Sequence, residues 1–155
     1  MIDEKWNQLT DDDWREFAQG WLAELREEDD SQEDSNEDFN DDDFDDDDSS
    51  FGQAVVSMNF TAHPEKQWQF ILVAVSLAES DDDLGHIAAG PIEHLLGWHG
   101  DKYISRVEEQ AASDAKFARA MLGVWKYMMN EEVWARVQAI QKRVENQQLS
   151  NDGNA

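Results

Sequence analysis

Apolar residues at helical spacing recur along most of this chain, and they restrict it to one fold class. In the first such stretch they follow one another at steps of three and one, which places them on one helix face; they are Trp14, Phe17, Ala18, Trp21, Leu22 and Leu25. Thr10 precedes this stretch as an N-cap, and three aspartates follow Thr10 at the positive end of the helix dipole. We therefore expect a helix that starts after Thr10, with Trp6 packed against its beginning.

The middle of the chain predicts a buried central helix over 65–79. Pro64 suits the first position of this helix, and the segment that follows is apolar on nearly every side, as in a helix surrounded by others. The preceding segment 53–60 is ambiguous between a short strand, a helical turn and an extended stretch.

Ser80 is the predicted cap of the next helical stretch, whose apolar residues keep phase through the Gly90-Pro91 pair. Because Pro91 lacks an N–H and crowds the carbonyl of Ile87, the stretch is either one kinked helix or two short helices that share a face. Gly100 is its expected C-terminal stop.

Three more helices are expected in the C-terminal third. The first covers 101–112, with four residues facing inward: Tyr103, Ile104, Val107 and Ala111. Ser113 is the expected cap of the second, whose core-facing residues are Phe117, Met121, Val124, Trp125 and Met128. Asn130 is the expected cap of the last helix, which runs to a polar tail. The fold class is thus all-α, with about six helices in antiparallel hairpins, forming an irregular bundle or a solenoid-like stack.

Charge divides the chain into four parts: an N-terminal helix (1–26), an acidic low-complexity insert (27–50), a helical body (51–146) and a polar tail (147–155). Between Glu27 and Asp48, 15 of 22 residues are acidic and none is basic. Like charges at this density repel, and the insert has little to bury, so we expect it to be disordered.

The densest part of the insert is a candidate partner-facing tract, because spaced aromatic residues among carboxylates can dock on a basic, partly apolar protein. This acidic tract consists of Asp41, Asp42, Asp43, Phe44, Asp45, Asp46, Asp47 and Asp48. The alternative is a solvated linker. An EF-hand does not fit, since the required glycine and glutamate positions are not occupied.

Composition excludes several function classes. A net charge of −24 disfavours direct nucleic-acid binding and anionic membranes, and it favours a basic protein partner. The chain has no cysteine, so thiol chemistry and disulfides are excluded. No signal peptide and no membrane-spanning run is predicted, and a cytoplasmic location is expected.

The stretch GHIAAGPIEHLLGWHG (85–100) holds three of the four histidines and four of the eight glycines. On one continuous helix His94 and His99 lie about 140° apart, so they do not share a metal from one face. Neither a His-Glu-x-x-His motif nor a phosphate loop nor a credible nucleophile is present, and we predict no metal, no cofactor and no catalytic residue.

Glu93 is the residue of most interest in this stretch, because Gly90 and Gly97 flank it on one helical stripe and leave a shallow slot. A helix or a ligand can approach closely at such a slot. The candidate binding residues are Gly90, Glu93, Gly97, Trp98 and His99. The alternatives for Glu93 are a structural bond to capping amides or to Arg106, Arg119 or Arg136, a binding role, and a role as general acid or base.

Several motifs resemble a bacterial family of small proteins built around a domain of unknown function. Its Ala-Ala-Gly-Pro, Glu, Leu-Leu and His-Gly run matches Ala88–Pro91, Glu93, Leu95–Leu96 and His99–Gly100; a later Phe and a Gly-Val-Trp element match Phe117 and Gly123–Trp125. The resemblance implies a helical bacterial domain and brings no established activity.

The leading functional expectation is a non-enzymatic module that binds a basic protein, such as an inhibitor or immunity-type protein directed at a nuclease-like toxin or a DNA-handling enzyme. The alternative is a small-ligand binder or enzyme that uses Glu93 and His99 in the glycine-lined slot.

Overall fold

The computed structural model describes residues 4–32 and 51–152, with side chains described for 4–27 and 51–147. The acidic tract Asp41–Asp48 lies outside the described residues. Every regular element in the described part is helical, which confirms the predicted all-α class: η1 (Glu4–Gln8), α1 (Asp11–Gln32), α2 (Phe51–Thr61), α3 (Pro64–Leu77), α4 (Asp81–Ile87), η2 (Ala88–Ile92), α5 (Glu93–Ser113), α6 (Ala115–Ala120), η3 (Met121–Gly123) and α7 (Glu131–Asp152).

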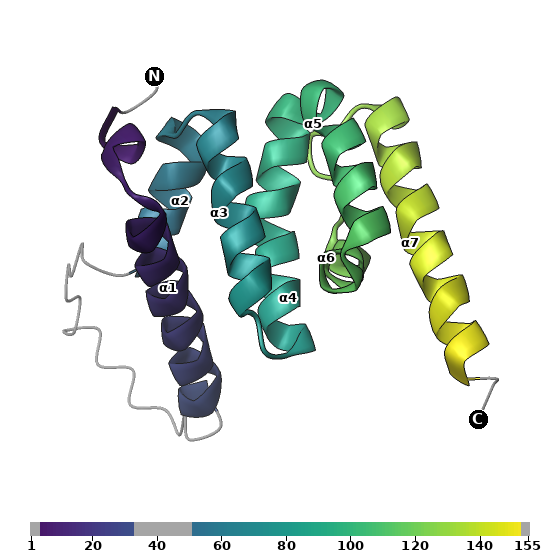
Figure 1. Ribbon diagram of the computed structural model, residues 1–155, viewed down its shortest axis with the longest axis horizontal. Coiled ribbons are helices and arrows are strands. Elements are labelled where there is room, and N and C mark those ends of the chain that lie inside the picture. Colours follow the sequence, from purple (N-terminus) through teal and green to yellow (C-terminus); the bar gives the residue numbers. More distant parts are fainter. Residues whose placement is uncertain (1–3, 33–50, 153–155) are drawn as a thin grey trace.

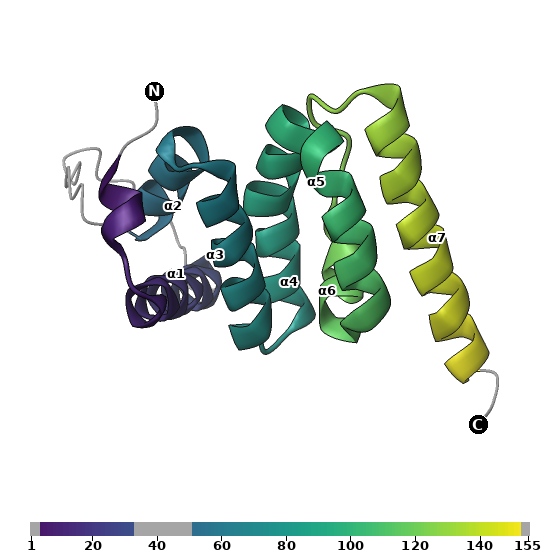
Figure 2. The same ribbon diagram turned by 45° about the horizontal axis from the view of Figure 1, so that its top comes forward.

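The helices follow one another along the long axis of the molecule in roughly their order in the chain. Figures 1 and 2 show α1 and α2 at one end, α3 to α6 in the middle and α7 at the other end. One apolar core runs through all of them, from Trp14 in α1 to Ile140 in α7. In the described part of the chain, no helix combines the length and the apolar character needed to cross a bilayer.

Aromatic side chains close the α1 end of this core. The ring of Phe17 lies 5.2 Å from that of Phe70 in the central helix and 6.1 Å from that of Trp14. Trp6 stacks on Trp14, as expected, and its indole N–H donates to the hydroxyl of Thr61 at 2.8 Å. Thr10 and Asp13 bond reciprocally, which confirms the predicted cap of α1.

The ambiguous segment before the central helix is α2. Its buried residues Val55 and Met58 are three apart, which suits a helix. Glu24 of α1 receives the first amides of α2, since the N–H groups of Phe51 and Gly52 both donate to its carboxylate. The ring of Phe51 lies over Gly20, where an added Cβ would come within 2.3 Å of it. Helix α1 therefore anchors the start of α2.

The Gly90-Pro91 pair neither ends the helix nor separates two helices. The chain instead widens into the π-helical turn η2, in which the N–H of Glu93 bonds to the carbonyl of Ala88. Such a turn accommodates the missing amide of Pro91 without loss of helical direction. The real break comes at His99, with φ −133° and ψ 22°, one residue before the predicted stop at Gly100.

In the C-terminal third, two details differ from the expectations and one agrees with them. Asp114, not Ser113, caps α6, because its carboxylate accepts from the N–H groups of Lys116 and Phe117. The helix after it ends at Gly123, so Trp125 and Met128 lie on a loop and are exposed, while Met129 is buried instead. At Asn130 the predicted cap of α7 is confirmed by a bond from the N–H of Val133.

Two helices run further than expected, α1 to Gln32 and α7 to Asp152. Apart from Leu149 both extensions are polar, and neither contains Gly or Pro, so no helix-breaking residue stops the helix there.

Candidate functional site

The glycine-rich stretch lies against a later segment of the same chain. The loop 124–130 and the elements on either side of it contact this stretch at four successive points. Gly123 packs on Ala88, Trp125 bonds to Glu93, Tyr127 lies on Gly97, and Val133 lies on Gly100. The motifs that carry the family resemblance thus touch one another in space, although more than twenty residues separate them.

Glu93 holds this loop through its carboxylate. The N–H of Trp125 donates to its Oε1 at 2.6 Å. Among the alternatives for Glu93 this is nearest to the structural bond to amides, although the amide belongs to a loop and not to a helix end. Burial raises the pKa of Glu93 above 4.5, and the bond from Trp125 opposes this rise only partly. The three arginines considered as partners pair elsewhere: Arg106 with Glu65, Arg119 with Asp81 and Arg136 with Glu108.

The two glycines that flank Glu93 have different surroundings. A Cβ on Gly97 would lie 2.5 Å from the carbonyl oxygen of Tyr127, so this backbone fills the space that the missing side chain leaves. A Cβ on Gly90 would meet no described atom within 4 Å. The expected slot beside Glu93 is therefore occupied by the protein's own loop at Gly97 and faces open space at Gly90.

Two histidines of the stretch, His94 and His99, are buried or half-buried, and the break in the helix falls at His99 itself. His94 is buried, with its ring 4.6 Å from that of Phe60, and burial lowers its pKa. Burial, together with the nearby charges of Lys102 and His63, lowers the pKa of His99 as well. Both rings are therefore held in the neutral form more firmly than a free histidine. Among the side chains that the structure describes, in residues 4–27 and 51–147, no three acidic or histidine groups gather in a way that could hold a metal ion.

A small pocket opens beside the break. Its volume is about 290 Å³, and it brings together three of the predicted binding residues, Gly97, Trp98 and His99, with Met128 and Asn130 of the facing loop. Asn130 donates to the carboxylate of Asp101 at 2.9 Å, which fixes that carboxylate in the pocket wall. Gly90 and Glu93 are not among the residues that line it.

Exposed apolar side chains continue from this pocket toward α2. Phe60 packs edge-on against His94, whose ring lies 6.0 Å from that of Trp98, and Trp98 shares the pocket with Met128. We call the four exposed residues here the Trp98 surface; they are Val56 (52% exposed), Phe60 (62%), Trp98 (53%) and Met128 (60%).

Three of these four residues escaped the sequence analysis, which named Trp98 as a site residue and placed Met128 in the core. One signal in the sequence could have found them. Phe51–Thr61 contains no charged residue, and Met121–Asn130 contains only Lys126, in a chain that is 31% charged. The structure adds a second sign that the sequence does not carry, since Met128 has φ 55°, a backbone conformation that is costly for this residue type and that clusters at functional sites.

A model of a family of unknown function (DUF6869) matches residues 40–145. The chain belongs to this family. The match begins inside the acidic insert (27–50), well before the motifs that carry the resemblance. In the searches of curated proteins and of solved structures, nothing matches.

Proposed function

We propose that this member of a family without established activity is a non-enzymatic acidic module that binds a basic protein. In its narrower form, the proposal is an inhibitor or immunity-type protein that blocks the partner by occupying its surface. The observation that carries the proposal is the Trp98 surface, which is apolar, exposed and formed by segments almost free of charge.

The composition of this surface matches that of a protein interface. The cores of interfaces are depleted in charged residues and enriched in aromatic residues and methionine. Between Gly85 and Gly100, Glu93 is the one residue with a full charge, and Trp125 holds it by a backbone bond. Exposed apolar groups of this size, gathered in one place, commonly mark a binding site rather than an accident of folding.

The charge of the chain supports a basic partner. A net charge of −24 attracts cationic proteins over distances longer than any contact, and most of it comes from the acidic insert. Charge of this kind mainly raises the rate of encounter, whereas buried aromatic contacts determine how long a complex lasts. In this proposal the insert speeds the encounter with the partner, and the Trp98 surface holds the complex together.

The alternative, an enzyme or ligand binder that uses Glu93 and His99, has weaker support. The carboxylate of Glu93 is engaged by Trp125, and the space at Gly97 is filled by Tyr127. Both observations favour a structural role for Glu93. The test is Glu93→Gln, since the amide keeps an acceptor for Trp125 while removing the charge that acid–base chemistry or a ligand would need.

The test of the main proposal has two steps. The immobilised full chain is first used to capture proteins from its native host, and a captured basic protein is then purified and its Kd measured by calorimetry. We expect Trp98→Ala to weaken binding about tenfold or more, as for a buried aromatic anchor. The control is Gln138→Ala on the exposed face of α7, which should leave the Kd unchanged. An unchanged Kd for Trp98→Ala, or the recovery of no basic protein, would contradict the proposal.

A further inference from the structure

We propose that the pocket beside Trp98 receives an arginine side chain of the partner, with the guanidinium stacked on the indole and bonded to Asp101. This inference rests on the proposed function, because it assumes that a basic protein docks on the Trp98 surface. It adds the chemical identity of the group that enters the pocket.

The size of the pocket fits one side chain. At about 290 Å³, it lies just below the range of roughly 300–1,000 Å³ found for sites that enclose whole small molecules. It is bordered on one side by α5 and on the other by the loop that carries Met128 and Asn130. A single long side chain, presented by a larger partner, would fill such a space.

The pocket wall offers two groups that a guanidinium recognises. The exposed indole of Trp98 has an electron-rich face, and arginine stacks on such faces more readily than lysine does. Asp101 supplies a carboxylate whose Oδ1 accepts one bond from Asn130 at 2.9 Å. A carboxylate has about four acceptor positions, so Asp101 retains the capacity to receive the guanidinium.

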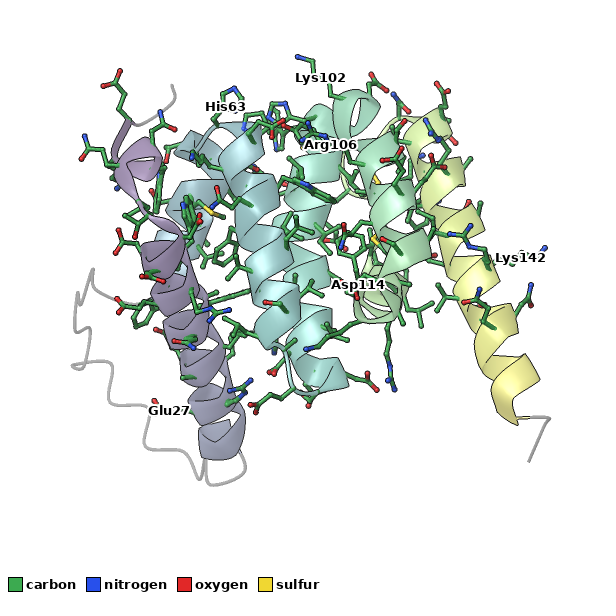
Figure 3. All side chains as sticks on the ribbon, in the orientation of Figure 1. Glu27, His63, Lys102, Arg106, Asp114 and Lys142 are labelled. Carbon is green, nitrogen blue, oxygen red and sulfur yellow. The ribbon has the colours of Figure 1, made fainter. Side chains whose placement is uncertain are left out.

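The remaining lining is compatible with a cation. Leu96, Met128 and Val133 give apolar contacts to the methylene stem of an incoming arginine. His99 does not oppose the charge, because burial and neighbouring cations lower its pKa and leave it neutral at pH 7. Lys102 also borders the pocket, and its charge is one of those that lower the pKa of His99. Its exposed side chain extends outward from this end of the molecule (Figure 3), so an arginine that enters the pocket would meet Asp101 rather than the ammonium group of Lys102.

Short peptides test this recognition without the partner. The probes are acetyl-Gly-Arg-Gly-amide and two analogues, with citrulline or norleucine in place of arginine. Binding to the full chain is followed by NMR, through the indole N–H signal of Trp98, which is assigned by comparison with Trp98→Phe. At physiological salt we expect the arginine peptide to shift this signal saturably with a Kd near the millimolar range, and the citrulline peptide to bind about tenfold more weakly.

Two charge-removing variants separate the local contact from general attraction. Asp101→Asn keeps an acceptor for Asn130 and should raise the Kd of the arginine peptide about fivefold or more. Asp82→Asn, which removes the same charge from the exposed start of α4, should leave its Kd unchanged. Equal binding of the arginine and citrulline peptides, or equal effects of the two variants, would overturn the inference.

Preferential binding of the norleucine peptide would also overturn the inference, since it would mean an apolar anchor. That outcome leaves the proposed function standing, because loss of partner binding in Trp98→Ala is measured separately.

Discussion

Gly90 and Gly97 occupy equivalent places in the sequence, one turn to either side of Glu93, yet the structure gives them different tasks. We predict that Gly97→Ala lowers the free energy of unfolding by about 1–3 kcal/mol, because the new Cβ would lie 2.5 Å from the backbone oxygen of Tyr127 and displace the loop. Gly90→Ala meets no described atom and should be neutral or stabilise by up to about 1 kcal/mol. Urea denaturation measures both; equal effects would contradict the packing assigned to Gly97.

Glu93 allows a prediction that depends on pH. Its folded-state pKa is raised by burial, so the stability it contributes is fully present below about pH 4.5 and is lost as the pH rises through the folded pKa. Relative to Glu93→Gln, the native protein should therefore become more stable as the pH is lowered from 7 to 4.

Glu93→Ala should lower the free energy of unfolding by about 1 kcal/mol at pH 7, since it leaves the N–H of Trp125 without its acceptor.

The same residues show what sequence reasoning can and cannot reach at this scale. Helical spacing placed Gly90, Glu93 and Gly97 on one stripe, and a bond from Glu93 to backbone amides was among the alternatives. Which part of the chain would approach this stripe depends on how two distant segments pack. Nothing in the local pattern around Gly97 indicates Tyr127, so the loop that fills the slot could not be predicted.

Between elements, Asp83 connects the start of α4 to α1. Its carboxylate is buried and accepts from Arg26 at 2.6 Å and from the N–H of Glu79 at 2.8 Å. We predict that Asp83→Asn costs about 2 kcal/mol, since a buried charged acceptor is lost while half-exposed Arg26 regains water. As a comparison, Arg119→Ala removes the nearby exposed salt bridge to Asp81 and should lower the free energy of unfolding by well under 1 kcal/mol.

The Asp83 contact also predicts acid sensitivity. Burial alone would raise the pKa of Asp83, but the bonds from Arg26 and Glu79 outweigh it and hold the pKa below 3.8. Its contribution is therefore present above pH 3.8 and lost as the pH falls through the folded value. In urea denaturation, the difference in free energy of unfolding between the native protein and Asp83→Asn should become smaller as the pH falls below 3.8. A gap independent of pH would contradict this assignment.

Helix positions were predictable wherever a local signal sets them. Thr10, Ser80 and Asn130 cap the helices that the sequence assigned to them, because capping depends on the neighbouring amides alone. The segment after Gly123 was not predictable in this way, since Val124 and Met128 continue a helical spacing although the chain there is not helical. There the chain leaves the helix, and the side-chain amide of Gln141 in α7 donates hydrogen bonds to the carbonyls of Met121 and Val124.

Across the whole molecule, charge and apolar exposure are separated. The helices from α1 to α7 pack around one core, and the Trp98 surface is formed by residues of α2, the start of α5 and the loop 124–130. The acidic residues concentrate between Glu27 and Asp48. The four residues of the Trp98 surface carry no charge, and Asp101 and Lys102 lie at its edge, in the pocket beside Trp98.

This separation leads to a kinetic prediction. Replacing the seven aspartates of the acidic tract by asparagine, with Phe44 kept, changes the net charge from −24 to −17. For the captured basic partner we expect a slower association rate, by about tenfold at low salt, and a nearly unchanged dissociation rate, because steering acts before contact. Trp98→Ala should do the reverse and speed dissociation, which surface plasmon resonance distinguishes directly.

Salt provides the control for the kinetic prediction. At high ionic strength the Debye length falls to about 3 Å, so the native chain and the asparagine variant should associate at similar rates. The Trp98→Ala defect should persist there, since apolar contact is not screened. If the asparagine variant instead dissociated faster at every salt concentration, the acidic tract would be in direct contact with the partner, and the division of tasks between charge and the Trp98 surface would be wrong.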